Sequence, residues 1–497
     1  RPALPPPPAP AAGAPPARPP PPPRDRFRGL ADRLDGDLIR PGDPRYPVAR
    51  QLDNGYFDTV EPAAIAYCAS VADVRTVLGF AQDRALPTAI RSGGHSAAGY
   101  STTTGLVLDV SRLNRIDVGR STVAVGPGTQ AVDVLGTLAA HGIAAVTGNC
   151  PTVCAGGYLQ GGGIGPLARK FGVASDHLVA AEVVLADGTV ENVSARHHPD
   201  LFWALRGGGG GNFGVVTRFE ITPVRADRMV TYALVWSWDR TADVIAAYQT
   251  WAEQAPEDLV ANLNLVLPNA TPGATPSVSV SGGWLGGDPD GLTPQLDALI
   301  AAVGVVPLRN QVTDQTYTAS MMRTFGCADL STAQCHRTGA TPQGTLARHT
   351  FVVNRGRLLT RPLPAPAIDR LLTAFESAPA DGQLRVVSWA ALGGRINRVA
   401  PDATAYVHRS ARHYVAVTAQ LPVAVPDPDA RAAAQSWADG CFEIVAAHGR
   451  EGQVNFIDPR LPDWRTAYYG QNYPRLAAVK RSYDRYGFFR FPQAVGR

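Results

Sequence analysis

The order of apolar and polar positions along the chain changes character near residue 223. From about residue 27 to 223, short runs rich in Val, Ile and Ala alternate with stretches whose apolar residues recur every three or four positions. The runs are typical of buried strands, and the stretches are typical of amphipathic helices. This part is therefore expected to be α/β or α+β, with several strand–helix units and a hairpin turn at Asp187-Gly188.

Longer stretches of apolar and polar alternation follow residue 223, among them TYALVWSW, NLNLVLP, SVSVSGGWL and YVAVTAQLP. Alternation predicts strands with one covered and one open face. Helical patterns near 240–255 and 365–377 interrupt these stretches. We therefore expect a second domain in which helices cover one face of a mostly antiparallel sheet. The sequence has no apolar run of about 18 residues, the length a membrane span needs.

The first 26 residues are dominated by proline and alanine and carry almost no bulky apolar side chain. This composition favours an extended, solvated, disordered chain. A spacer after a removed export signal is the favoured interpretation, with an expression artefact or an interdomain linker as alternatives. The rest of the chain is long enough for two or three substructures.

Charged residues are scattered along the chain and give a net charge of +4, with lysine only at Lys170 and Lys480. Scattered arginine without a basic stripe argues against nucleic-acid binding. Two of the six cysteines, Cys327 and Cys335, lie eight positions apart in a polar loop. We predict a disulfide there, which suits an oxidising compartment, and no cysteine spacing indicates a zinc site.

Three glycine-rich clusters in the first part carry the candidate chemistry. RSGGHS occupies residues 91–96, six glycines lie within residues 156–165, and RGGGGGNFG occupies residues 206–214. Glycine permits positive φ and brings backbone N–H groups close to a ligand, as a pyrophosphate requires. Three such loops in one region predict a site for a large, extended cofactor.

A family resemblance extends beyond these clusters. RSGGHS, CPTV, GGGIG, DLFWALRGGGGGNFGVVT and YYGQNYPRLAAVKRSYDRYGFFRFPQ follow one another over nearly the whole chain after residue 27. Together they resemble the berberine bridge enzyme-like family of FAD-linked oxidases, in the vanillyl-alcohol oxidase (PCMH-type) superfamily. The resemblance implies an α+β protein with a PCMH-type FAD-binding domain of two α/β subdomains (27–225). A substrate-binding domain (226–452) follows, and a C-terminal segment (453–497) returns to the FAD domain.

The same resemblance implies an FAD bonded covalently to His95 through the flavin 8α-methyl carbon and to Cys150 through flavin C6. Cys150 is expected rather than Cys154, because only Cys150 stands before Pro-Thr-Val. Both bonds withdraw electrons and fix the ring. Further cofactor contacts are expected from Arg91, Ser92, Gly93, Gly94, Ser96, Gly148, Asn149, Gly157, Gly161, Gly162, Gly163, Gly165, Val215, Asn472 and Tyr473.

The usual base of the family is missing. Members carry a segment like Tyr-Val-Asn-Tyr-x-Asp, whereas residues 453–458 here read QVNFID, so both tyrosines are replaced. Phe456 stands at the base position and cannot transfer a proton. The candidates for catalysis are Tyr473, Tyr406 and His408, with Tyr158 and Tyr414 as alternatives. Val417 is expected at the position of a polar helper, and the substrate pocket around Trp236, Trp284, Trp389 and Tyr406.

Three interpretations of the missing base stay open: another residue replaces it, the substrate needs no strong base, or the protein has changed its task. The leading hypothesis is an FAD-dependent oxidase that takes hydride from a sugar or secondary-metabolite alcohol and reduces O2 to H2O2. A flavoprotein with lost or altered redox chemistry is the alternative. We expect a bacterial protein, secreted or exported or else cytoplasmic, monomeric or homodimeric, with a small-molecule substrate and neither nucleic acid nor membrane as partner.

Overall fold

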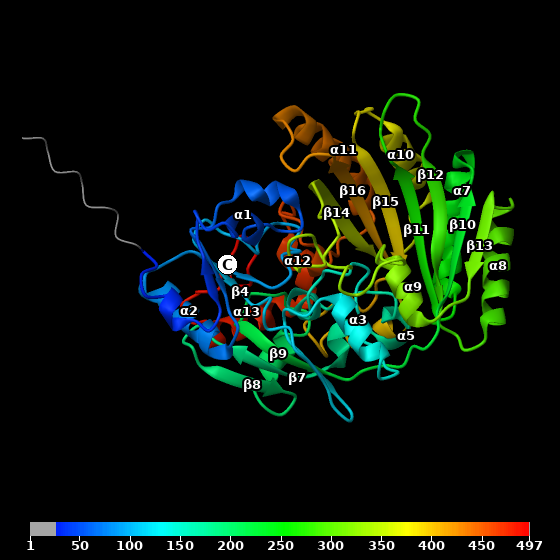
Figure 1. The fold of residues 1–497 in the computed structure, drawn as a ribbon. Helices are drawn as coiled ribbons and strands as arrows, with labels where there is room; N and C mark the ends of the chain where they lie inside the picture. The colour runs from blue at the N-terminus through cyan, green and yellow to red at the C-terminus, as the bar shows by residue number, and fades with distance from the viewer. Residues whose placement is uncertain (1–25, 497) are drawn as a thin grey trace, which may run out of the picture.

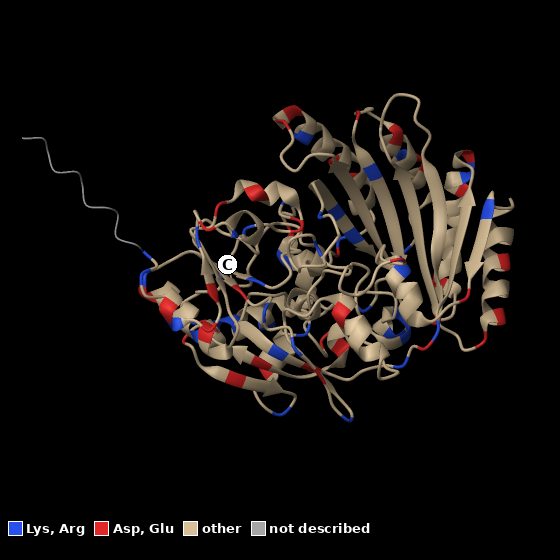
Figure 2. Cartoon of the chain, viewed as in Figure 1, with Lys and Arg blue, Asp and Glu red and all other residues tan. Residues whose placement is uncertain are grey.

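The computed structural model describes residues 26–496, which form two lobes side by side (Figure 1). The Pro/Ala-rich segment expected to be disordered lies outside the described residues, apart from Arg26. Acidic and basic residues are interspersed over both lobes in the view shown (Figure 2). None of the helices within residues 26–496 combines the length and apolar character needed to cross a membrane.

A four-stranded sheet opens the first lobe, in the order β1-β2-β4-β3. Strands β2 and β3 both pair in parallel with β4, because α2 crosses from β2 to β3. Strand β1 pairs antiparallel with β2. The Ser70 hydroxyl caps α2 by accepting a hydrogen bond from the Asp73 N–H, and the buried face of the helix packs on this sheet. The elements are β1 (Asp37–Ile39), β2 (Ala64–Tyr67), α2 (Val71–Asp83), β3 (Thr88–Arg91) and β4 (Leu106–Asp109).

A five-stranded sheet completes the first lobe, in the order β5-β6-β9-β7-β8. All its pairs are antiparallel, including the β7–β8 hairpin predicted at Asp187-Gly188. Only the smaller sheet of this lobe thus has the parallel strand–helix character that the sequence pattern suggested. The elements are β5 (Ile116–Val118), β6 (Val123–Val125), α3 (Ala131–Ala139), α4 (Ala155–Gln160), β7 (Leu178–Val184), β8 (Val190–Ser194), α6 (Pro199–Ala204) and β9 (Val215–Ile221).

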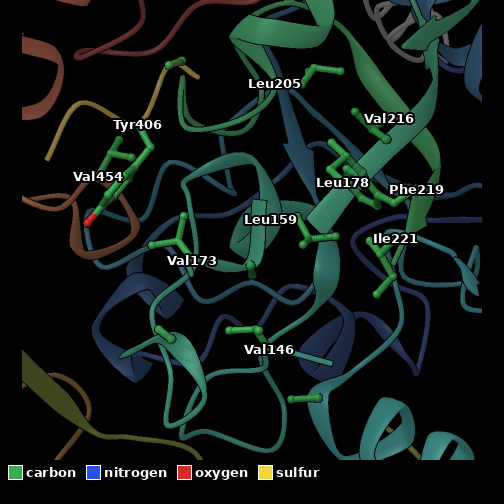
Figure 3. Packing of buried hydrophobic residues seen from close by; sticks show 14 of the residues in the cluster. Val146, Leu159, Val173, Leu178, Leu205, Val216, Phe219, Ile221, Tyr406 and Val454 are labelled. Carbon is green, nitrogen blue, oxygen red and sulfur yellow. The ribbon is translucent and has the colours of Figure 1, made fainter. Parts of the chain in front are cut away.

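A hydrophobic cluster on this sheet also holds distant parts of the chain. Leu178 of β7 and Phe219 of β9 share it with Tyr406, from the second lobe, and with Val454, from the C-terminal segment (Figure 3). The apolar contacts of the cluster therefore join both lobes and the C-terminal segment.

The second lobe is a seven-stranded antiparallel sheet in the order β13-β10-β12-β11-β15-β16-β14. Helices α7, α8, α10 and α11 cover one face (Figure 1), because buried residues alternate along the strands and point to that side. The elements are β10 (Val230–Trp236), α7 (Thr241–Gln254), β11 (Leu259–Leu267), β12 (Ser277–Trp284), α8 (Thr293–Val303), β13 (Arg309–Thr313), α9 (Tyr317–Thr324), β14 (Phe351–Leu359), α10 (Ala365–Glu376), β15 (Leu384–Ala391), β16 (His413–Leu421) and α11 (Pro428–Ala446).

The C-terminal segment packs back on the first lobe through α12 (Trp464–Tyr469) and α13 (Tyr473–Tyr483). A buried lysine fixes it there. Lys480 Nζ donates to the Asn212 carbonyl at 2.5 Å and to the Phe489 carbonyl at 2.6 Å, and pairs with Asp484 at 2.6 Å. These bonds tie α13 and the following tail to the third glycine cluster.

The predicted disulfide between Cys327 and Cys335 is formed, in the segment that follows α9. Closing this short loop restricts the unfolded chain. Replacing both cysteines by serine is therefore expected to lower the free energy of unfolding by about 2–3 kcal/mol. Denaturant unfolding of the wild-type protein should respond to reductant, whereas unfolding of the double variant should not. Equal unfolding midpoints of the wild-type protein with and without reductant would contradict the expectation.

Candidate functional site

A cavity of about 790 Å³ lies between the lobes. Its first wall consists of the three glycine clusters, and its second wall of strands β14 and β16. The C-terminal segment closes it with residues 454–457 and 489–492. This volume is at the upper end of ligand sites, as expected for an extended cofactor together with a substrate.

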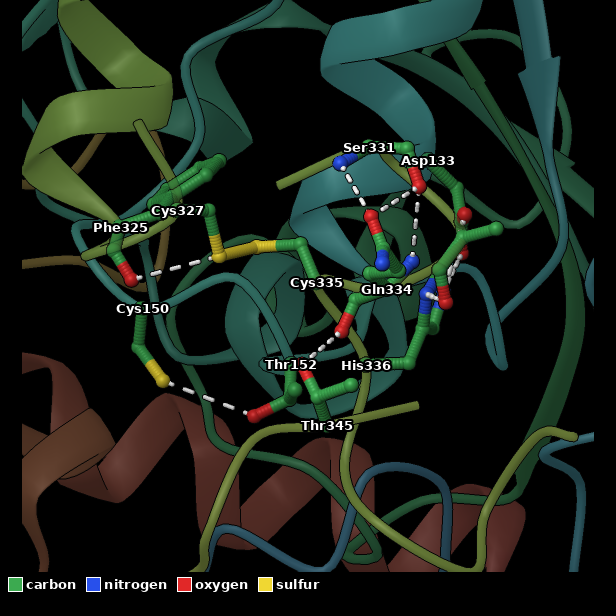
Figure 4. Close-up of a disulfide and its surroundings, with 11 residues drawn as sticks. Asp133, Cys150, Thr152, Phe325, Cys327, Ser331, Gln334, Cys335, His336 and Thr345 are labelled. Atoms are coloured by element: carbon green, nitrogen blue, oxygen red, sulfur yellow. Dashed lines mark hydrogen bonds and ion pairs between the residues drawn. A yellow bond between two sulfur atoms is a disulfide. The ribbon is translucent and has the colours of Figure 1, made fainter. Parts of the chain in front are cut away.

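His95 and Cys150 meet on the first wall of this cavity. His95 Nε2 lies 2.9 Å from the Thr152 hydroxyl, and Cys150 Sγ lies 3.6 Å from the same oxygen. Figure 4 shows Cys150 and Thr152 beside the segment that carries the disulfide. Burial lowers the pKa of His95 and raises the pKa of Cys150, so both groups favour their neutral forms. Two nucleophilic side chains 55 positions apart thus line the cavity close together, since both contact the Thr152 hydroxyl.

Most of the predicted cofactor residues line the cavity. They are Ser92, Gly93, Gly94, His95, Ser96, Gly148, Asn149, Cys150, Gly157, Gly161 and Val215. The space beside Gly157 is open, since a Cβ there would meet no atom within 4 Å, and at Gly210 the nearest atom would be 3.6 Å away. The third cluster, from Gly209 to Asn212, also contributes. Such a slot accepts a flat ring close to the backbone.

The amide of Asn455 fixes the shape of the second cluster. Its Oδ1 accepts from the Gly163 N–H at 3.0 Å, and its Nδ2 donates to the Gly157 and Tyr158 carbonyls at 3.2 and 3.1 Å. Gln453 Nε2 donates to Asn455 Oδ1 at 2.9 Å. Gln453, which replaces one family tyrosine, therefore orients the asparagine that holds the loop.

Several predicted cofactor residues lie behind the wall rather than on it. Arg91 forms a buried ion pair with Asp109 beneath the first cluster. Gly162, Gly163 and Gly165 do not line the cavity, and their backbones pack against Tyr406, Tyr158 and the Thr147 carbonyl. These three glycines therefore fix the shape of the second glycine cluster, because their backbones pack closely against those groups. Asn472 is buried, and its Nδ2 donates to the Pro401, Thr404 and Ala405 carbonyls.

The three residues predicted for catalysis do not line the cavity. His408 Nδ1 pairs with Glu451 at 3.1 Å, and its Nε2 lies 3.0 Å from the Tyr468 carbonyl. The Tyr473 hydroxyl accepts from Arg465 Nε at 3.1 Å. Tyr406 is buried over Gly162 and Gly207, and burial raises its pKa. These contacts give all three residues a structural task.

The two alternative tyrosines also have buried, unpartnered hydroxyls within residues 26–496. Tyr158 lines the cavity, but its ring lies between Gly148 and Gly163, and burial raises its pKa well above the usual value. Burial likewise raises the pKa of Tyr414, which is stacked behind Phe456 with the ring centroids 5.0 Å apart. A phenol that resists ionisation is a poor base.

The sheet wall carries polar residues that the sequence reasoning missed. Asn354 of β14 and Thr418 and Gln420 of β16 face the cavity, and Asn354 Nδ2 donates to Thr418 Oγ1 at 2.8 Å. The expected helper position, Val417, points to the opposite face and is fully buried. The prediction was off by one residue, which on a strand exchanges the two faces.

The aromatic residues expected around the substrate lie elsewhere. Trp236, Trp284 and Trp389 belong to the core between the sheet and its helices, and none of them lines the cavity. Their strands bury every second residue on the helix side, and the tryptophans occupy those positions. The face that these strands turn away from the helices is lined by smaller and more polar residues.

Two sequence families match the chain. The FAD binding domain family matches residues 62–194, and the family described as berberine and berberine like matches residues 454–496. The chain thus carries two regions typical of berberine bridge enzyme-like flavoproteins, as the sequence resemblance implied. It is an FAD-linked oxidoreductase, and the matched regions provide the first two glycine clusters and the C-terminal wall of the cavity.

Known proteins are similar to the chain over half or nearly all of its length. The chain is 29% identical to the FAD-linked oxidoreductase YgaK of Bacillus subtilis (strain 168), over 93% of this chain and 97% of that protein. It is 34% identical to (R)-6-hydroxynicotine oxidase of Paenarthrobacter nicotinovorans, over 51% of this chain and 56% of that protein. Wild-type BBE-like 1 of Physcomitrella patens has the same fold, with a TM-score of 0.82 and 23% identity over 94% and 98% of the two chains.

The cavity fits the FAD of this family at both ends. None of the backbone N–H groups of Gly93, Gly94, His95 and Ser96 donates to a backbone carbonyl within residues 26–496. Free amides in a tight turn are suited to a pyrophosphate. At the other end, the open slot beside Gly157 and the pair formed by His95 and Cys150 are suited to a ring that is held at its edge.

Phe456, which the sequence resemblance places at the position of the family's base, lies at the site itself. It lines the cavity and is 42% exposed. Asn354, Thr418, Gln420 and Asn455 provide amide and hydroxyl groups on the same cavity. The site can therefore bind and orient a polar substrate, but Phe456 provides no proton acceptor at the expected point.

Proposed function

We propose that this FAD-linked oxidoreductase is an oxidase whose FAD is bonded covalently to His95 and Cys150. The convergence of both side chains on the Thr152 hydroxyl carries the proposal. The 8-methyl group and C6 belong to the same benzenoid ring of the flavin. Because His95 and Cys150 lie close together on the wall, they can reach the 8-methyl group and C6 of one bound flavin.

FAD held in this cavity would supply the redox chemistry, taking a hydride from the substrate and passing the electrons to O2 as H2O2. The glycine clusters bind the pyrophosphate and the ring by backbone contacts, and the C-terminal segment excludes water from one side. Asn354 and Thr418 orient the substrate on the sheet wall.

The substrate is an alcohol, such as a sugar or secondary-metabolite hydroxyl, or an amine. Phe456 favours a substrate that needs no strong protein base. An amine with a neutral nitrogen meets this requirement, since its lone pair assists hydride departure. The 34% identity to (R)-6-hydroxynicotine oxidase supports the amine alternative.

A flavoprotein without oxidase activity is the second candidate, and Phe456 is the observation that favours it. Anaerobic mixing with panels of sugars, aromatic alcohols and amines distinguishes the two. An oxidase loses its flavin absorbance with a substrate and recovers it on admission of air, with release of H2O2. Unchanged absorbance with every compound in all three panels would favour the second candidate.

We also infer that the protein is exported to an oxidising compartment. The disulfide between Cys327 and Cys335 supports this inference, since such bonds persist outside the reducing cytosol. Cell fractionation of the native source, with the protein detected by antibody, tests it. Recovery in the cytosol with both thiols free would contradict it.

Replacing Phe456 by tyrosine is expected to increase the rate of flavin reduction by alcohols by about 10-fold or more, because a phenol at this position can accept the hydroxyl proton. Stopped-flow reduction under anaerobic conditions measures the effect. Phe488→Tyr is the matched control, since Phe488 does not line the cavity. Equal reduction rates of the Phe456→Tyr variant and the wild-type protein with all alcohols would contradict the expectation.

A further inference from the structure

We propose that Asp53 and His349 form a proton-accepting pair that prepares His95 for covalent attachment of the flavin. This inference rests on the proposed function, because it concerns how the His95 bond forms. Neither residue belongs to the glycine clusters, and the two are 296 positions apart. Both line the cavity beside His95.

The three side chains form a chain of contacts from the cavity wall towards solvent. Asp53 Oδ2 lies 3.6 Å from His95 Nδ1 and 2.8 Å from His349 Nδ1. The side chains of His95 and Asp53 are 19% and 21% exposed, whereas that of His349 is 53% exposed. A proton that leaves His95 can thus reach the surface through two neighbouring groups.

Backbone contacts hold Asp53 in this position. Its own N–H donates to the Gly94 carbonyl at 3.1 Å, which joins it to the turn that carries His95. The Gly55 N–H donates to the His349 carbonyl at 2.9 Å, and Arg348 Nη1 donates to the Leu52 carbonyl at 3.2 Å. These backbone hydrogen bonds before, at and after Asp53 therefore hold its carboxylate between His95 and His349.

Protonation states suit this role. Burial lowers the pKa of His95, so the ring is neutral and keeps one lone pair for bonding. Burial alone would raise the pKa of Asp53, but the hydrogen bond from His349 and nearby positive charge lower it, so the carboxylate stays ionised. The hydrogen bond to Asp53 raises the pKa of His349.

The attachment step needs a group that removes a proton. A bond forms between a His95 ring nitrogen and the 8α-methyl carbon, while one N–H bond and one C–H bond break. The proton of the imidazole passes from Nδ1 to Asp53 Oδ2, since a neutral ring would otherwise become a cation. The methyl proton and two electrons would pass to the isoalloxazine ring, and O2, the external oxidant, would then reoxidise the ring and leave as H2O2 with the second proton. The Thr152 hydroxyl on the other side of the ring is no base at neutral pH.

Replacing Asp53 by asparagine is expected to slow attachment at His95 by about 100-fold, the lower end of what a positioned base contributes. The isosteric amide keeps the contact with His349 but accepts no proton. Asp53→Glu should recover the rate to within about 10-fold of the wild type, and His349→Gln should slow it about 10-fold. The full-length protein is produced under riboflavin limitation and then given FAD. In-gel flavin fluorescence after denaturation and mass spectrometry of the His95 peptide follow the reaction.

Asp58→Asn is the matched control. Asp58 pairs with Arg348 and thereby holds the same loop, but it does not contact His95. Its variant should attach flavin at the wild-type rate. Equal rates for Asp53→Asn and wild type, or equal slowing by Asp58→Asn, would overturn the inference while leaving the covalent bond in place. Wild-type protein without flavin on His95 would overturn the proposed function as well.

Discussion

Replacing both His95 and Cys150 by alanine is expected to give a protein that releases all of its flavin on denaturation. The wild-type protein should keep its flavin, because both side chains line the cavity and lie close together beside Thr152. Either single variant should retain the flavin through the other bond. Absorbance of the acid-precipitated protein at flavin wavelengths and fluorescence in denaturing gels measure the retained fraction.

The neighbouring thiol gives a control for this experiment. Cys154 is buried and its Sγ lies 3.2 Å from the Gly128 carbonyl, and burial raises its pKa beyond the usual range. Cys154→Ala should therefore retain covalent flavin as the wild-type protein does. Complete release from His95→Ala alone would show that Cys150 is no second attachment point, and a colourless wild-type precipitate would refute covalent attachment altogether.

Replacing Lys480 by methionine is expected to lower the free energy of unfolding by about 3–5 kcal/mol, because it leaves Asp484 as an unpaired buried charge. Lys480 and Asp484 have side chains only 7% and 1% exposed. The lost bonds to the Asn212 and Phe489 carbonyls add to the effect. Chemical denaturation followed by tryptophan fluorescence measures the change.

Lys170 is the natural control, since it is the only other lysine of the chain. Its side chain is 30% exposed and pairs with Asp258, so Lys170→Met should cost less than about 1 kcal/mol. Adding Asp484→Asn to the Lys480→Met variant should restore part of the stability by removing the buried charge. A Lys480→Met variant as stable as the Lys170→Met variant would contradict the expectation.

Glycine clusters were predictable from the sequence because their constraint is local. A backbone that must bend with positive φ and approach a ligand needs glycine, whatever surrounds it. Gly94 and Gly209 accordingly combine positive φ with a place in the lining of the cavity. The alternation of apolar residues likewise predicted the helix-covered sheet, since burial on one side of a strand repeats every second residue.

The roles of residues that act through tertiary contacts could not be predicted from the sequence, because those contacts form only in the folded protein. His408 and Asn472 look like functional polar residues in the sequence, but the fold uses them to satisfy buried carbonyl groups. Thr418 differs from Val417 only by the side of the strand it occupies, which depends on register. Asp53 and His349 carry no motif, and only the fold brings them to His95.

The closing wall of the cavity comes from residues that are synthesised long after the glycine clusters they cover. Residues 489–492 line the cavity, and Val495 N–H donates to Asn212 Oδ1 at 2.9 Å. The enclosure for the cofactor therefore cannot exist until translation has passed residue 492. Chains that stop before residue 489 would leave the cofactor open to exchange.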